Sequence, residues 1–176
     1  MADAFALEVV TPEQDLLAGP ATALILRTAE GNLTVLDGHT PLIGNVEPGE
    51  VRVEQEDGSV VRLAVHGGFL QVDTRPGAAD GADPAAQGGP IPGLSTRVTV
   101  LAGIAELVTE IDVARAQAAK ERVESALADL RGAGSRPSEQ AEEGAASAEA
   151  ALVEAEEALA RAELRLSLTA PDQHGA

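Results

Sequence analysis

Aromatic side chains are almost absent from this chain. Its 176 residues include no tryptophan, no tyrosine and two phenylalanines, Phe5 and Phe69. Any core must therefore be built from valine, leucine, isoleucine and alanine, which offer few bulky anchors. A chain of this length forms either one ordinary domain or a small domain with an appendage, and the scarcity of aromatics favours the second arrangement.

Cysteine is absent and basic residues are scarce. Without thiols the chain can form neither disulfides nor thiolate metal sites, which is compatible with a reducing compartment. Twelve lysines and arginines stand against 29 acidic residues, for a net charge of −17. This charge repels phosphate backbones and anionic lipid surfaces, so we expect no nucleic-acid partner.

Long hydrophobic runs are also missing. No segment approaches the roughly 20 apolar residues that a membrane-spanning helix requires. The first ten residues, MADAFALEVV, lack the basic region and the apolar stretch of a secretory signal. We therefore expect no direct membrane insertion, and any association with a membrane would depend on partners.

The chain contains no complete catalytic or metal-binding motif. No G-x-x-x-x-G-K-[ST] phosphate loop is present, and the chain has one lysine, Lys120. The triplet at residues 66–68, His-Gly-Gly, resembles part of an esterase oxyanion loop, but no G-x-S-x-G turn accompanies it. The three histidines, His39, His66 and His174, lack metal-ligand spacing. We predict neither a catalytic nor a metal site, and the paired glycines predict a turn or bulge within β-structure.

The first part of the chain, from Ala4 to Asp73, has the pattern of short antiparallel strands. Its β-type runs are AFALEVV, ATALILRT, NLTVL, EVRVEQ and SVVRLAVHGGFLQVD, separated by turn signals at 18–20, 30–32, 37–38, 47–49 and 57–58. A stretch rich in glycine, proline and alanine follows at about 76–96, and one more strand is expected at 98–101. The prediction is an antiparallel β-sandwich or flattened barrel of about ten strands over residues 1–110.

After Asp112 the hydrophobic period changes to that of helices. One apolar stripe comprises Val113, Ala116, the stem of Lys120, Val123, Leu127 and Leu130; another comprises Leu152, Ala155, Leu159, Ala162 and Leu166. The two helices are predicted to pair as an antiparallel hairpin over 111–170, with a loop at about 132–144, the second helix from about 145, and a disordered tail at 171–176. Their alanine-rich seam predicts a weakly held pair.

Four segments together carry a resemblance to a known family. In chain order they are EGNLTVLDGHTPLI, VEPGEVRV, LAVHGGFLQVD and RVTVLAGIAELVTEIDVARAQAAKERVESAL. Their order and spacing resemble the epsilon subunit of the F-type, rotary ATP synthase over nearly the whole chain. The most specific parts are the turn from Gly38 to Leu42, the strand at 67–69 and the strand-to-helix junction at 98–119.

The resemblance implies a fold, a function and partners. It implies a ten-stranded sandwich followed by a helical hairpin, in a subunit without an active site that sits in the central stalk and regulates ATP hydrolysis through its helices. The expected partners are the gamma subunit, the ring of c subunits and the alpha/beta hexamer, at the cytoplasmic face of a bacterial membrane. The turn residues Gly38, His39, Pro41 and Leu42 are implied to contact gamma or the c-ring.

The resemblance also implies a regulatory ATP site, although no cofactor is required for the main function. The family motif [IL]-D-x-x-R-A matches Ile111 to Ala116. Carried over position by position, the nucleotide contacts would be Glu106, Asp112, Arg115, Ala116, Arg161 and Arg165. Two arginines four apart share one helix face and can bind phosphates.

A purely structural role explains the same residues equally simply. Asp112 is a good helix N-cap, Thr109 is an alternative start of a capping box, and Arg161 has Glu157 four residues before it. The acidic second helix predicts weak inhibition of ATP hydrolysis. The alternative function is a stand-alone nucleotide sensor or scaffold of the same fold.

Overall fold

The computed structural model describes residues 3–74, 95–133 and 141–170. The chain divides into two compact units, residues 1–110 and 111–176, and each is considered by itself. Most of the glycine-rich stretch predicted at 76–96, and the tail at 171–176, lie outside the described residues.

The first unit is built of β-strands, nine of them in the part that is described, where about ten were predicted. They are β1 Phe5–Val10, β2 Asp15–Thr28, β3 Gly31–Val35, β4 Leu42–Val46, β5 Gly49–Gln55, β6 Val60–Val65, β7 Gly68–Thr74, β8 Thr96–Ala102 and β9 Ala105–Leu107. A short 3-10 helix, η1 (Val108–Glu110), ends the unit. The predicted strand runs did not include β4 and β9, which are short and lie within or next to loop-like sequence.

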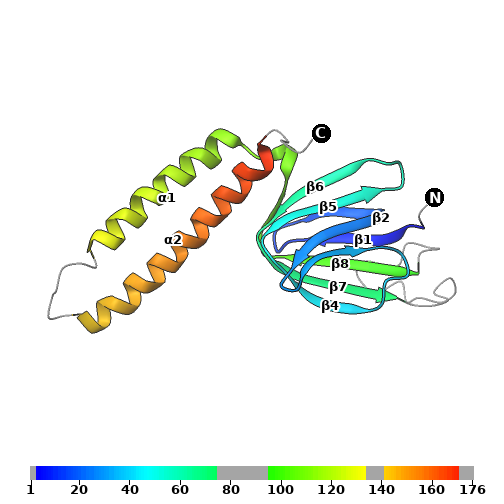
Figure 1. Ribbon diagram of the computed structural model, residues 1–176, viewed down its shortest axis with the longest axis horizontal. Helices are drawn as coiled ribbons and strands as arrows, with labels where there is room; N and C mark the ends of the chain where they lie inside the picture. Colours follow the sequence, from blue (N-terminus) through cyan, green and yellow to red (C-terminus); the bar gives the residue numbers. More distant parts are fainter. Residues whose placement is uncertain (1–2, 75–94, 134–140, 171–176) are drawn as a thin grey trace. The chain divides into compact units, whose positions relative to one another are not determined.

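The strands form two layers, visible in Figure 1, with the order β1-β8-β7-β4-β2-β5-β6-β9. β2 is 14 residues long and pairs with β1, β3, β4 and β5, so it contributes to both layers. The expectation of purely antiparallel pairing is wrong at one place, since β1 lies parallel to β8. Alternation of apolar residues does not encode the direction of strands that are distant in sequence.

The core lies between the two layers and follows the period-two alternation of the strands. In β8, for example, Thr96, Val98 and Val100 are buried while the residues between them are not. Phe5, Leu24, Leu63 and Leu70 are completely buried in one hydrophobic cluster. Burial of side chains of this size contributes about 1.5–3 kcal/mol each, which makes the sandwich the strongly stabilised unit.

The turn predicted at residues 18–20 is wrong, because these residues lie inside β2. Pro20 pairs with Ala6 and Gly19 with Leu7 in the ladder between β1 and β2. A register shift follows at once, between Ala21 and Ala23 in the pairing with β5. Proline is tolerated in a strand next to such an irregularity, so the Gly-Pro signal marks a change of partner strand here.

The second unit is an antiparallel pair of helices, α1 (Val113–Ala133) and α2 (Ala141–Thr169), seen side by side in Figure 1. α2 begins at Ala141, before the predicted start near residue 145. Among the residues whose side chains are described, the buried ones are Ile111, Ala116, Leu127 and Ala162.

Val113 was predicted to lie on the buried stripe and is instead 49% exposed. The reason is the register of the two helices. Lys120 on α1 contacts Glu163 on α2, so the residue one heptad earlier lies opposite the point where α2 ends at Thr169. Val113 therefore has no turn of α2 to cover it.

Candidate functional site

Asp112 caps the start of α1. The Arg115 backbone N–H donates to Asp112 Oδ1 over 2.9 Å, and the Ala116 N–H donates to the Asp112 carbonyl oxygen over 2.9 Å. The alternative that placed the cap at Thr109 is therefore wrong for this helix, which begins at Val113. The predicted structural role of Asp112 is confirmed, and one of its carboxylate oxygens is occupied by it.

The next two motif residues play different parts. Arg115 is fixed at the backbone by the cap, while its side chain is exposed near the positive end of the helix dipole. Ala116 is 3% exposed, and its N–H is already bonded within the first helical turn. Ala116 therefore packs the hairpin seam, and of these two residues Arg115 is the one able to present a charged group.

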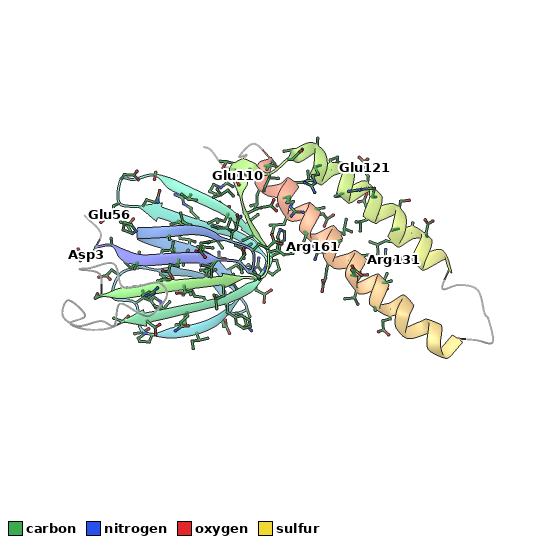
Figure 2. All side chains as sticks on the ribbon, turned by 180° about the vertical axis from the view of Figure 1, so that it is seen from behind. Asp3, Glu56, Glu110, Glu121, Arg131 and Arg161 are labelled. Atoms are coloured by element: carbon green, nitrogen blue, oxygen red, sulfur yellow. The ribbon has the colours of Figure 1, made fainter. Side chains whose placement is uncertain are left out.

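The predicted arginines of α2 are half-buried and lie four residues apart on one face. Arg161 forms the predicted i, i+4 ion pair, its Nη1 lying 3.7 Å from Glu157 Oε2. Figure 2 labels Arg161 on α2 and Arg131 on α1. Since Lys120 contacts Glu163, Arg161 and Arg165 belong to the half of the hairpin where α1 begins.

Five of the six predicted nucleotide contacts thus lie on the hairpin, and the sixth lies in the sandwich unit. Glu106 is the middle residue of β9, opposite Ala64 of β6. Its Oε1 lies 3.7 Å from Nε2 of His66, a side chain only 5% exposed. Inside its own unit Glu106 already has a partner, and its participation in a nucleotide site stays a prediction.

The turn that was predicted to contact partners is fixed rigidly to β7 and β8. Gly38 has a positive φ of 77°, and its N–H donates to Thr96 Oγ1 over 2.8 Å. The Thr74 hydroxyl donates to the His39 carbonyl oxygen over 2.6 Å, and His39 Nδ1 donates to the Thr40 carbonyl oxygen. Leu42 packs against the core, whereas Pro41 is exposed. The turn is therefore a rigid corner with Gly38 and Pro41 at its surface.

An exposed apolar surface, which the sequence reasoning missed, lies on the same layer. Leu101 pairs with Val10 of β1 and with Phe69 of β7, which in turn pairs with Asn45 of β4. Phe69 is 58% exposed, Leu101 47%, and Ile43, diagonal to Phe69, 76%. We call Ile43, Phe69 and Leu101 the apolar face. Their alternation with the buried residues Leu70 and Val100 was the signal that could have identified them.

Ion pairs lie on the outer surfaces of both layers. Arg52 pairs with Glu54 and Arg62 with Glu50 on β5 and β6, and Arg97 of β8 pairs with Glu8 of β1. Large exposed apolar side chains that are grouped on one face are typical of a protein that docks through this face.

A pocket of about 630 Å³ adjoins the apolar face. Its lining residues are Val10, Thr11, Pro12, His66, Gly67, Gly68, Phe69, Leu101, Ala102 and Gly103. Its walls are mostly apolar, and it gives the exposed face a recess into which a partner's side chain can fit.

Two other kinds of site were searched for in the described ranges. Within residues 3–74, 95–133 and 141–170, no group of three or more histidine and acidic side chains could hold a metal ion. Neither helix of the described chain is long and apolar enough to cross a membrane.

Comparison with known proteins identifies relatives that all belong to one family. Residues 4–75 match the family described as ATP synthase, Delta/Epsilon chain, beta-sandwich domain. The ATP synthase epsilon chain of Thermobifida fusca (strain YX) is 42% identical over 127 residues, covering 70% of this chain and 77% of the relative. The ATP synthase epsilon chain of Symbiobacterium thermophilum is 36% identical over 132 residues, covering 74% and 78%.

Among solved structures, a chain of the Euglena gracilis mitochondrial ATP synthase, determined with OSCP, F1 and the c-ring, has a TM-score of 0.55. It is 24% identical and covers 92% of this chain and 78% of its own. At this identity the likeness supports the fold, a sandwich followed by helices.

Proposed function

Because the chain belongs to the family of ATP synthase epsilon chains, it is a central-stalk subunit of the F-type ATP synthase, and we propose that it docks on the gamma subunit through its apolar face. Its partners in the complex are the gamma subunit, the c-ring and the alpha/beta hexamer. It belongs to a membrane-associated complex as a peripheral component.

The observation that carries the docking proposal is the grouping of three large exposed apolar side chains on neighbouring strands of one layer. The apolar face exposes Ile43, Phe69 and Leu101 to solvent in the isolated chain. Burial of large apolar side chains at about 25 cal/mol per Å² gives such a face a strong tendency to bind. The strands that hold it are rigid, so little ordering entropy opposes docking.

The docking test is a binding measurement with purified gamma subunit. Phe69→Asp places a charge in the middle of the apolar face and is expected to weaken binding at least tenfold, about 1.4 kcal/mol or more. Val60→Asp is the matched control, because Val60 is also a strand residue, 44% exposed, but on β6 of the other layer. Equal effects of the two substitutions, or none from the first, would contradict the proposal.

Two finer features of the function are also proposed. The subunit has no active site of its own, and it lies at the cytoplasmic face of the membrane; both rest on the resemblance of the whole chain to the family. The rigid corner at Gly38 and Pro41 is proposed to contact gamma or the c-ring, which Pro41→Asp would test in the same binding assay.

We further propose a regulatory ATP site that uses Arg115 together with Arg161 and Arg165. The exposed guanidinium of Arg115 lies at a capped helix start, and cations in this first turn are disfavoured by the helix dipole unless an anion is near. The ion pair of Arg161 with Glu157 is long, at 3.7 Å, and leaves this side chain able to exchange partners.

Calorimetry with millimolar ATP on the intact chain and on Arg115→Ala tests this site. Binding heat in the first and a large loss in the second are expected. Gln117→Ala serves as a control on the same turn of α1, since its side chain pairs with Glu121. No heat in any of the three proteins would remove the ATP proposal and leave the stalk function untouched.

A further inference from the structure

His66 belongs to a motif that the stalk function does not use. Its backbone N–H donates to the Ile104 carbonyl oxygen over 3.0 Å, and the Gly67 carbonyl oxygen accepts from the Gly103 N–H over 3.3 Å. The segment from His66 is thus joined to the turn that leads from β8 into β9. These backbone hydrogen bonds place His66 beside β9, the last strand of the sandwich.

The two glycines that follow His66 shape the backbone at this position. Gly67 has a φ of 97°, a conformation that side-chain-bearing residues rarely adopt. A Cβ placed on Gly68 would lie 2.2 Å from the Leu101 carbonyl oxygen, so the chain is pressed directly onto β8. The backbone at Gly68 is therefore packed closely against β8.

β9 is the shortest strand in the described part of the sandwich. It has three residues, pairs with β6 alone, and is followed by η1, which ends the unit at Glu110. Three residue pairs supply few backbone hydrogen bonds, and the β9 side chains are half-buried, with Ala105 and Leu107 at the margin of the core. Short segments with few buried contacts open locally before the rest of a domain unfolds.

The His66 ring lies beside Glu106 of this strand. Their Nε2 and Oε1 atoms lie 3.7 Å apart, with the histidine 5% and the glutamate 27% exposed. Other charged groups on the same side of the sheet as His66 include Arg62, four residues earlier on β6, and Glu50 on β5, which pairs with that arginine. The residues that approach from the β1–β2 turn, β7 and β8 are uncharged: Thr11, Pro12, Gly67, Gly68, Phe69, Leu101, Ala102 and Gly103.

We propose that His66 and Glu106 form a pH-dependent clamp that fastens β9 to β6 when His66 takes up a proton. A protonated imidazole beside a carboxylate in a site shielded from water is an ion pair, whereas a neutral imidazole offers Glu106 only a dipole. Histidine is the side chain whose charge changes between pH 5 and 8. The clamp closes as pH falls, and β9 opens more readily as pH rises through the titration of His66.

The first test is an NMR titration of the histidine ring signals of the intact chain. Glu106→Gln removes the negative partner and is expected to lower the His66 midpoint. Glu54→Gln is the control, because this carboxylate lies on β5 and pairs with Arg52. His39 serves as an internal reference. A His66 that stays uncharged between pH 5 and 8, or a midpoint that Glu106→Gln does not change, would overturn the proposal.

The second test measures the strand itself by amide hydrogen exchange. Because the His66 N–H donates to Ile104, the next hydrogen-bonded pair of this antiparallel ladder is Ala64 with Glu106, and the Glu106 N–H is the β9 amide that bonds to β6. In the wild type, protection of the Glu106 amide relative to that of Val53 of β5 is expected to fall severalfold as pH rises through the His66 midpoint. In His66→Gln, and in Glu106→Gln should the first variant fold poorly, this dependence is expected to vanish. The same pH dependence in wild type and variant would show that another group controls β9.

Discussion

The sandwich and the helical hairpin bury very different side chains, and the difference explains their different roles. The sandwich core is a cluster of leucines, valines and a phenylalanine, many of them completely buried. In the described part of the hairpin, two of the four buried residues are alanines, Ala116 and Ala162. Because stabilisation follows buried apolar area, we expect the sandwich to be the more stable unit and the two helices to be held together more weakly.

The contacts between the helices reinforce this contrast. Lys120 bonds to Glu163 over 3.1 Å, and Arg131 to Glu156 over 3.2 Å, both at the surface of the helix pair. Exposed ion pairs of this kind add little to stability and are weakened by salt. These ion pairs therefore contribute little to holding the two helices together.

The largest expected effect is a loss of core volume in the sandwich. Leu24 is completely buried at the centre of β2, so Leu24→Ala is expected to lower the free energy of unfolding by about 2–5 kcal/mol. Urea denaturation followed by circular dichroism measures this. Leu36→Ala is the control, since Leu36 is exposed. If Leu24→Ala destabilised the protein less than Leu127→Ala in the hairpin, the sandwich would not be the more stable unit.

A substitution in the hairpin seam is expected to unfold the arm alone. Leu127 is 4% exposed on α1, and Leu127→Ala should cost about 2 kcal/mol, enough to melt a weakly held pair of helices. Helical ellipticity should fall while amide protection of β5 and β8 is unchanged. Equal loss of protection in the strands would mean that the two units unfold together.

Removal of the helix cap is expected to have a smaller effect. Asp112→Ala deletes the bond from the Arg115 N–H and should destabilise α1 by about 1 kcal/mol, whereas Asp112→Asn keeps a capping oxygen and should cost little. Thermal melting of the helical signal compares them. The two variants also distinguish helix capping from nucleotide binding by Asp112. If Asp112→Asn abolishes ATP binding without loss of helicity, the negative charge itself contacts the ligand.

The sequence was sufficient for most of the fold. Alternating runs predicted β1, β3 and β5, and the shift to a helical period predicted the hairpin. The length of β2 could not be inferred, because its Gly19-Pro20 pair is also a turn signal and its use as a change of partner depends on tertiary pairing. The parallel pairing of β1 with β8 joins segments about 90 residues apart, which local patterns do not encode.

The candidate sites were predicted unevenly. The cap at Asp112 and the ion pair of Arg161 depend on residues three or four positions apart, so local rules sufficed. The apolar face needs the register of β7 against β8, and the proximity of His66 to Glu106 needs the pairing of β6 with β9. Contacts between strands form only when the sheet assembles, so the sequence of a single segment does not predict them.

The smallest expected effect isolates one ion pair of the hairpin. The hydrogen bond and charge of Glu163, with a smaller contribution from Glu124, raise the pKa of Lys120 above its ordinary value of 10.5. Because the pKa of Lys120 is higher in the folded than in the unfolded chain, its ion pair contributes fully to stability at a pH below the unfolded-state pKa. The contribution is lost as pH rises through the folded-state pKa. The loss that follows deprotonation of Lys120 therefore occurs above pH 10.5.

The composition makes this measurement unusually clean. The chain has one lysine, no tyrosine and no cysteine, and arginine stays charged at this pH, so among the side chains Lys120 alone titrates in that range. A small decrease of helical ellipticity above pH 10.5 is expected in the wild type and none in Lys120→Gln. The strand signal should be constant in both proteins, because no lysine lies in the sandwich. An equal decrease in Lys120→Gln would show that the two helices are not joined through this residue.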